Sequence, residues 1–119
     1  MTVTGIDHVQ VAAPAGCEPE ARAFYGDLLG LEERPKPEAL AGRGGCWFAA
    51  GAQELHVGVE EPFTPARKAH PGLVVGDLDG LAARLTAAGI AVAYDESIPG
   101  TKRFHAADPF GNRLEFREA

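Results

Sequence analysis

The sequence is short of the features that mark secreted, membrane-spanning or nucleic-acid-binding proteins. It has only two cysteines, Cys17 and Cys46, too few for a disulfide framework, so a reducing cytoplasm is the expected compartment. No apolar run approaches the roughly 20 residues that a bilayer-spanning helix needs, and the N-terminus lacks a basic-then-apolar signal segment. A net charge of −6 and an isoelectric point near 5.1 argue against a surface for nucleic acid. We therefore expect neither a membrane nor a nucleic acid as a partner.

Glycine and proline, by contrast, are abundant. The 15 glycines and 9 prolines among 119 residues indicate many turns, which suits a fold built from short strands. The apolar fraction of 45% and the charged fraction of 24% are ordinary for a soluble globular protein. A chain of this length forms one compact domain, or two half-domains that share a core.

The C-terminal residues 102–117 have the pattern of a β-hairpin. Two short runs with aromatic residues flank the turn DPFGN, in which proline presets φ and Gly111 supplies the positive φ that closes the turn. In the second run Leu114 and Phe116 alternate with three charged residues, so the charges share one face. If this face is turned towards a cavity, Glu115 is a buried carboxylate that needs a metal ion or a proton as its partner.

An earlier hairpin, residues 45–59, has the same plan of an aromatic strand, a glycine-containing turn and an alternating strand. His56 follows its turn glycine by five residues, and Glu115 follows its own by four. Each hairpin is preceded by a strand with a histidine near its start: His8 and His70 are 62 residues apart, and His56 and Glu115 are 59 apart. We infer two copies of a unit of about 60 residues, each a strand, a helix and three strands. The four residues at these matching positions, His8, His70, His56 and Glu115, are of the types that bind metal ions in proteins.

The remaining elements follow from the hydrophobic period and from capping residues. Residues 18–31 have the apolar stripe of a helix, and a second helix begins at the N-cap Asp77 and ends at Gly89. Residues 35–44 are expected to be a polar loop, and residues 96–101 a loop that can act as a lid. The expected strands are residues 2–13, 31–34, both strands of the 45–59 hairpin, 69–75, 90–94 and both strands of the 102–117 hairpin. The chain is then a single domain of module one (1–60), a linker (61–68) and module two (69–119).

The doubled unit resembles the vicinal oxygen chelate superfamily. That family includes glyoxalase I, fosfomycin-resistance proteins, methylmalonyl-CoA epimerase, extradiol ring-cleaving dioxygenases and bleomycin-binding proteins. The resemblance covers essentially the whole chain and is most specific at FYGDLLGL (residues 24–31) and DPFGNRLE (residues 108–115). It implies an α+β fold in which two βαβββ modules form a cupped mixed sheet around a metal-binding cavity. It also implies a homodimer, because short two-unit chains of this family pair.

The resemblance also implies a ligand set. By position, His8, His70 and Glu115 match the usual metal ligands of the family, and His56 matches a further carboxylate ligand of glyoxalase I. Glu54 lies two residues earlier on the same strand face and is the rival for this fourth position. A divalent metal ion is thus the expected cofactor, and imidazole and carboxylate donors suit Zn, Ni, Co, Mn or Fe alike. A lone histidine in a strand is more often an ordinary side chain, but four equivalent positions favour binding.

Other residues are candidates for contact with a small-molecule substrate. His105 precedes Glu115 by ten residues, where fosfomycin-resistance-type proteins carry a ring that reaches the substrate. It is either an acid or base or a cross-strand neighbour without a role. Trp47 is either a wall that stacks on the substrate or part of the core. Gln10 shares the histidine-bearing face of the first strand and is predicted to bind substrate. Arg103 either steers an anionic substrate or belongs to a solvated edge.

The activity that the resemblance implies is that of a metal-dependent enzyme of the glyoxalase type. This would be an isomerase, lyase or transferase whose substrate binds the ion through adjacent oxygens. Glu115 would be a ligand that also moves a proton, with His105 as the alternative base. Three alternatives stay open: a ring-cleaving dioxygenase, a non-catalytic antibiotic-binding protein of the bleomycin-resistance type, and a small α+β dimer whose histidines are structural.

Overall fold

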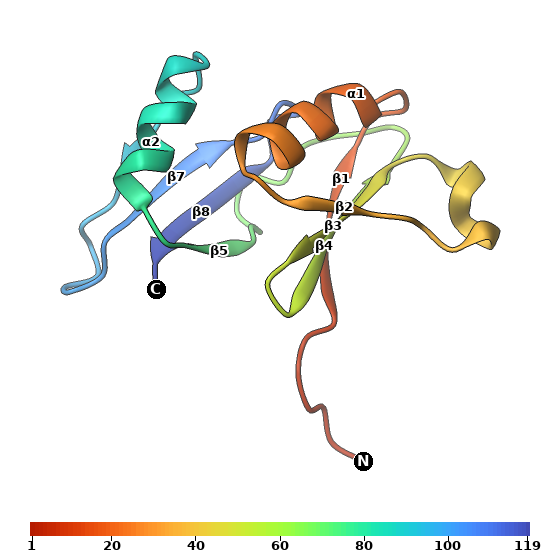
Figure 1. The fold of residues 1–119 in the computed structure, drawn as a ribbon, viewed down its shortest axis with the longest axis horizontal. Coiled ribbons are helices and arrows are strands. Elements are labelled where there is room, and N and C mark those ends of the chain that lie inside the picture. Colours follow the sequence, from red (N-terminus) through yellow and green to blue (C-terminus); the bar gives the residue numbers. More distant parts are fainter. The chain divides into compact units, whose positions relative to one another are not determined.

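Each half of the chain folds into a four-stranded mixed sheet with a helical segment packed against it (Figure 1). The computed structural model describes residues 1–119 and divides into two compact units, Met1–Thr64 and Pro65–Ala119. The fold is α+β, and each unit has the βαβββ order expected from the sequence. In chain order the elements are β1 (His8–Ala13), α1 (Glu18–Ala21), η1 (Arg22–Leu28), β2 (Glu32–Arg34), η2 (Glu38–Arg43), β3 (Cys46–Ala50), β4 (Gln53–Val59), β5 (Gly72–Val75), α2 (Leu78–Ala87), β6 (Ala93–Tyr94), β7 (Arg103–Ala107) and β8 (Arg113–Glu118).

The sheet of the first unit has the strand order β1-β4-β3-β2, with β1 parallel to β4 and the other pairs antiparallel. The register sets Gln10 and Trp47 on either side of His56, and His8 opposite Glu54. Because residues in register share a face, these five side chains lie on the same side of the sheet. The buried side chains of this unit include Val11, Phe24, Tyr25, Phe48, Leu55 and Val57.

The first helix is wider than expected at its C-terminal end. The sequence predicts one helix over residues 18–31, whereas the structure has a short α1 followed by the π-helical η1. The Leu29 N–H donates to the carbonyl of Phe24, five residues back, at 2.9 Å, and Gly30 ends the helix at φ 76°. In this wider turn the consecutive residues Phe24 and Tyr25 are both buried, next to β3.

The sheet of the second unit has the order β5-β8-β7-β6, and β5 runs parallel to β8. Glu115 of β8 is in register with His105 of β7 and with Gly72 of β5. Helix α2 packs against β8, and its N-cap Asp77 accepts a hydrogen bond from the Gly80 N–H at 3.0 Å, as the sequence predicts. The core of this unit includes Leu78, Leu85, Phe104, Leu114 and Phe116.

Three strand boundaries predicted from the sequence are wrong. β1 begins at His8 rather than at residue 2, and β6 is reduced to Ala93–Tyr94. β5 begins at Gly72 rather than at residue 69, which leaves His70 just before the strand. Pro71 separates the two, and it has no backbone N–H to donate to a ladder.

The segment expected to be a polar loop, residues 35–44, contains the 3₁₀-helix η2. This helix begins after Pro37, whose carbonyl accepts a hydrogen bond from the Leu40 N–H at 2.8 Å. Proline suits this position because its fixed φ is compatible with the start of a helix and its missing N–H has no partner to lose there. None of the helices has the length and apolar character of a membrane span.

Candidate metal centre

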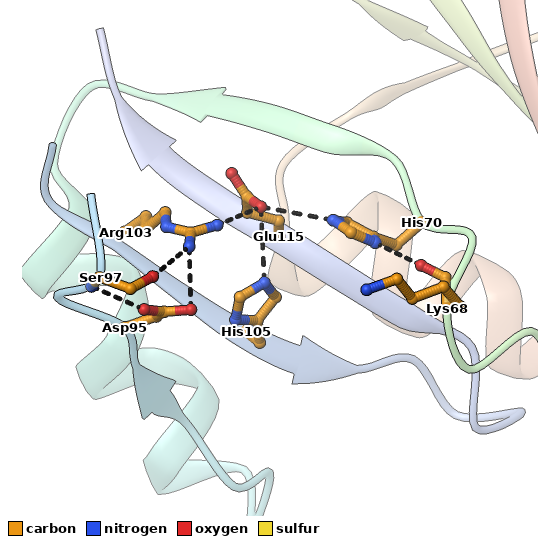
Figure 2. Close-up of polar contacts among 7 residues, drawn as sticks. All are labelled: Lys68, His70, Asp95, Ser97, Arg103, His105 and Glu115. Carbon is orange, nitrogen blue, oxygen red and sulfur yellow. Dashed lines mark hydrogen bonds and ion pairs between the residues drawn. The ribbon is translucent and has the colours of Figure 1, made fainter.

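Three nitrogen atoms converge on one oxygen of Glu115 in the second unit (Figure 2). Arg103 Nη1 lies 2.8 Å from Glu115 Oε1, His70 Nε2 lies 3.3 Å from it, and His105 Nε2 lies 3.4 Å from it. The ligand atoms of His70, His105 and Glu115 all lie within 4.8 Å of one another. The side chains come from β8, from β7 and from the segment just before β5, so the cluster depends on the register of three chain segments.

The turn before β8 helps to set the position of Glu115. Asp108 Oδ1 accepts hydrogen bonds from the backbone N–H groups of Phe110 and Asn112, each at 2.9 Å, and Gly111 has φ 92°. Asn112 Oδ1 accepts from the Ala66 N–H at 3.3 Å, which ties the turn to the start of this unit. The DPFGN turn is therefore a corner held by hydrogen bonds, and Glu115 follows it three residues later.

His70 is held by the backbone through its other ring nitrogen. Nδ1 lies 2.7 Å from the carbonyl oxygen of Lys68. Since a carbonyl oxygen only accepts, Nδ1 carries a hydrogen, and the ring is turned so that Nε2 lies on the side of Glu115. A backbone carbonyl that orients an imidazole in this way is the usual support of a metal-binding histidine.

Charge and burial give the cluster the protonation states that a cation requires. Burial acts to raise the pKa of Glu115, but the hydrogen bond with His70 and the positive charge of Arg103 outweigh it, so this pKa lies below its usual value. Burial, with the positive charges of Arg113 and Arg103, lowers the pKa of His105 against the opposing effect of Glu115. At neutral pH the carboxylate is therefore ionised and the His105 imidazole is neutral.

Arg103 lies inside this cluster and not at an open rim, its side chain being only 12% exposed. Its Nη2 lies 2.9 Å from Asp95 Oδ2 and 3.1 Å from Ser97 Oγ, while Nη1 reaches Glu115 (Figure 2). Its Nε is buried and has no hydrogen-bond partner. The guanidinium group thus joins the carboxylate to the segment that follows β6.

In the first unit the imidazole of His56 lies between two rings. The ring centroid of Trp47 is 3.9 Å away with an interplanar angle of 1°, and that of His8 is 4.2 Å away at 15°. At the edge of the ring, Nε2 lies 2.9 Å from Glu54 Oε1, and His8 Nδ1 lies 3.0 Å from Asp7 Oδ2. His56 and Glu54, the rivals for one ligand position, are therefore bonded to each other.

Gln10 lies on the same face, across the ladder from His56. A Cβ atom on Gly58 would be 2.5 Å from Gln10 Nε2, so the missing side chain of this glycine is what lets the amide lie over the strand. The exposed Gln10 can present its amide to a ligand on this face.

The structure groups the residues predicted from the sequence into two sets. His70, Glu115, His105 and Arg103 lie together in the second unit, and His8, His56, Trp47 and Gln10 share one face of the first. The donor chemistry of the second-unit cluster fits a divalent ion, since it offers a carboxylate and two imidazoles with no thiolate.

Sequence reasoning missed Asp95 and Ser97. The two lie 8 and 6 residues before Arg103 and belong to no recognisable motif. The one available signal was an acidic residue at the start of a loop next to a hairpin whose first strand begins with an arginine. Only the return of this loop alongside β7 shows that the two side chains meet Arg103.

Comparison with known proteins agrees with this description. The family model described as glyoxalase/bleomycin resistance protein/dioxygenase superfamily matches residues 5–116. One match is the crystal structure of a glyoxalase family protein from Bacillus anthracis. Its sequence is 56% identical to that of this chain, the two structures align with a TM-score of 0.95, and the match covers 99% of this chain and 97% of that one. No curated protein matches the chain.

Two structures of lower identity share the fold. Lactoylglutathione lyase from Agrobacterium tumefaciens is 23% identical with a TM-score of 0.76, over 100% of this chain and 96% of that one. TnmS3, an antibiotic-binding protein from Streptomyces sp. CB03234, is 22% identical with a TM-score of 0.76, over 99% and 98% of the two chains. Because the family model spans nearly the whole chain, this protein belongs to the glyoxalase/bleomycin resistance protein/dioxygenase superfamily.

Proposed function

We propose that the chain is a divalent-metal-dependent enzyme of the glyoxalase type that acts on a small substrate with adjacent oxygen atoms. One observation carries the proposal. The buried carboxylate of Glu115, which is ionised at neutral pH, lies 3.3 Å from an imidazole nitrogen of His70 and 3.4 Å from one of His105. Burying a carboxylate is unfavourable unless it is paired, and this arrangement pairs it with groups that a divalent ion also binds.

His70 and Glu115 are the proposed ligands from the second unit. His8 and His56 are proposed as the further ligands on the grounds of their sequence positions. When bound, the ion would supply Lewis acidity that favours negative charge on a substrate oxygen. The role of Glu115 is to hold the ion and to accept a proton on its carboxylate, and His105 is the alternative base through its neutral imidazole.

A second candidate is a binding protein without turnover, such as the name of the antibiotic-binding TnmS3 describes. The observation that favours it is the stack of Trp47, His56 and His8, because the exposed His8 at one end leaves a ring face on which a planar ligand can stack without any metal. Metal content separates the two candidates. A stoichiometric ion supports the enzyme, whereas metal-free protein that binds a planar antibiotic supports the binding protein.

The test is elemental analysis of the purified full-length chain, followed by titration of metal-stripped protein with Co²⁺. The single tryptophan, Trp47, stacks on His56, so its fluorescence reports binding at that ring. Removing a ligand of the core set, His70→Ala or Glu115→Ala, is expected to weaken Co²⁺ binding by more than about 100-fold, because the second unit then keeps only one of its two proposed ligands. Loss of His56 alone should weaken it by about 10-fold, because both proposed ligands of the second unit and His8 remain.

Two further variants serve as controls in the same titration. Glu54→Ala should change the Co²⁺ affinity little, and His105→Ala should keep most of it, because neither residue is a proposed ligand. If Glu54→Ala weakens binding more than His56→Ala, Glu54 is the fourth ligand. If His105→Ala weakens binding as strongly as His70→Ala while His8→Ala does not, the ligand set proposed here is wrong and the ion belongs to the second-unit cluster alone.

A further inference from the structure

Arg103 bridges two groups that are remote in sequence. One end of its guanidinium group donates to Glu115 Oε1 at 2.8 Å, and the other meets Asp95 Oδ2 at 2.9 Å and Ser97 Oγ at 3.1 Å (Figure 2). Both Arg103 and Glu115 have side chains that are 12% exposed, so water competes poorly for these bonds. All four residues belong to the second unit.

We propose that Arg103 is a positioning residue that clamps Glu115 to the segment 95–97 and so orients the carboxylate for metal binding. This inference rests on the proposed function. Glu115 has a flexible side chain, and a glutamate without a partner would lose its preferred orientation towards His70 and His105. The planar fork of an arginine can bind two groups at once, and Asp95 and Ser97 hold that fork in place.

The chain contains a matched control for charge. Arg117 is directly opposite Arg103 in the β7–β8 ladder, two residues from Glu115 on the same face, and it is exposed. It forms no ion pair or hydrogen bond through its side chain. Substituting either arginine therefore removes one positive charge from the same face, but only the loss of Arg103 releases the carboxylate.

The two effects have opposite signs, and this makes the inference testable. Removing a nearby positive charge favours binding of a cation, so a pure charge effect makes Co²⁺ bind more tightly to both variants. Loss of orientation weakens binding, and outer partners of metal ligands typically account for about 10–100-fold in affinity. We expect Co²⁺ to bind at least about 10-fold more weakly to Arg103→Ala and within about 3-fold of the unsubstituted protein to Arg117→Ala.

Conservative variants separate positioning from a general structural role. Arg103→Lys keeps the positive charge, but a lysine ammonium is compact and cannot hold Glu115 and Asp95 together as the arginine fork does. We therefore expect its Co²⁺ affinity to lie between those of the unsubstituted protein and Arg103→Ala. Asp95→Asn is expected to weaken Co²⁺ binding several-fold in the presence of Arg103 and by no more than about 2-fold in the Arg103→Ala background. The absorption bands of bound Co²⁺ should shift in Arg103→Ala and remain unchanged in Arg117→Ala.

The outcomes decide between the alternatives. If Arg103→Ala binds Co²⁺ as tightly as Arg117→Ala, or more tightly, the inference is wrong. If Arg103→Ala fails to fold, the Asp95→Asn and Arg103→Lys results decide it. If the unsubstituted protein binds no Co²⁺, the proposed function fails. The clamp by Arg103 is then tested separately, by measuring hydrogen exchange of the backbone amides of residues 95–101 in metal-free protein. Faster exchange in Arg103→Ala than in Arg117→Ala supports the clamp, and equal exchange overturns it.

Discussion

Equivalent positions of the two units differ sharply in side-chain chemistry. In the first unit Trp47 and His56 face each other across the β3–β4 ladder and stack as rings, whereas in the second unit His105 and Glu115 occupy the matching pair as imidazole and carboxylate. The same backbone scaffold therefore holds a stack of aromatic rings in one unit and a charged cluster in the other. The exposed His8 at the end of the stack leaves a ring face for a planar ligand, and the charged cluster is suited to binding a cation.

Glu18 is a carboxylate outside the candidate metal centre, and it makes the stability of the first unit depend on pH. Glu18 Oε2 accepts a hydrogen bond from the Gly45 N–H at 2.6 Å, and chiefly for this reason the pKa of Glu18 lies below 4.5, its ordinary value. A carboxyl group with a lowered pKa stabilises the folded state fully above its ordinary pKa, and this stabilisation is lost as the pH falls through the lowered pKa.

We therefore predict that Glu18→Gln lowers the free energy of unfolding at pH 7 by about 1 kcal/mol, because a neutral acceptor replaces a charged one. The difference from the unsubstituted protein should shrink as the pH falls below 4.5, where Glu18 itself becomes protonated. Urea unfolding at pH 7 and at a series of acidic pH values measures this. A constant difference at every pH would contradict the assignment, and the same series for the exposed Glu20→Gln gives the control.

At the level of elements, the β7–β8 hairpin depends on its turn. Asp108 and Asn112 are 5% and 3% exposed, and their side chains bond to each other and to three backbone N–H groups. Polar groups this deeply buried stabilise a structure only when they are hydrogen-bonded. The turn is for this reason a part of the core of the second unit, although it is built from polar residues.

Asn112→Ala should accordingly destabilise the protein by about 2 kcal/mol, because Asp108 Oδ2 and the Ala66 N–H each lose a partner within the fold. The measurement is the midpoint of urea unfolding followed by circular dichroism. Thr86→Ala, on the exposed side of α2, is the control and should stay within about 0.5 kcal/mol of the unsubstituted protein. If Asn112→Ala destabilises the protein by no more than Thr86→Ala does, water replaces the missing hydrogen bonds and the prediction is wrong.

At the scale of the whole molecule, each unit has its own core and its own sheet with two edge strands. Val9 on the edge strand β1 and Val74 on the edge strand β5 are 38% and 68% exposed. Exposed edges with apolar residues favour association with another chain. A chain of 12.5 kDa also has limited capacity to bury such surface by itself.

We predict that the protein is a homodimer in solution. Light scattering coupled to size-exclusion chromatography should give a mass twice the 12.5 kDa of the chain, and the value should hold on tenfold dilution from micromolar concentrations. A mass of 12.5 kDa at every concentration would rule the dimer out.

Much of the architecture could be predicted because its signals are local. The turn at Gly111, the N-cap at Asp77 and the alternation around Glu115 each depend on a few adjacent residues, and the repeat of marked residues predicts two similar units. The helix ending at Gly30 was predicted as regular, but its π-helical turn depends on how Phe24 and Tyr25 pack against the sheet, which no local pattern records.

From the sequence alone we could predict the family resemblance, the two-unit topology and the strand face that Glu115 shares with its neighbouring charged residues. Only the tertiary structure showed that Arg103 joins Glu115 to Asp95, and that His56 bonds to Glu54 while stacked between two rings. The physical reason is the range of the interactions. Turns and strand faces follow from neighbouring residues, whereas the partners of a buried charge come from separate segments and depend on strand register and loop path.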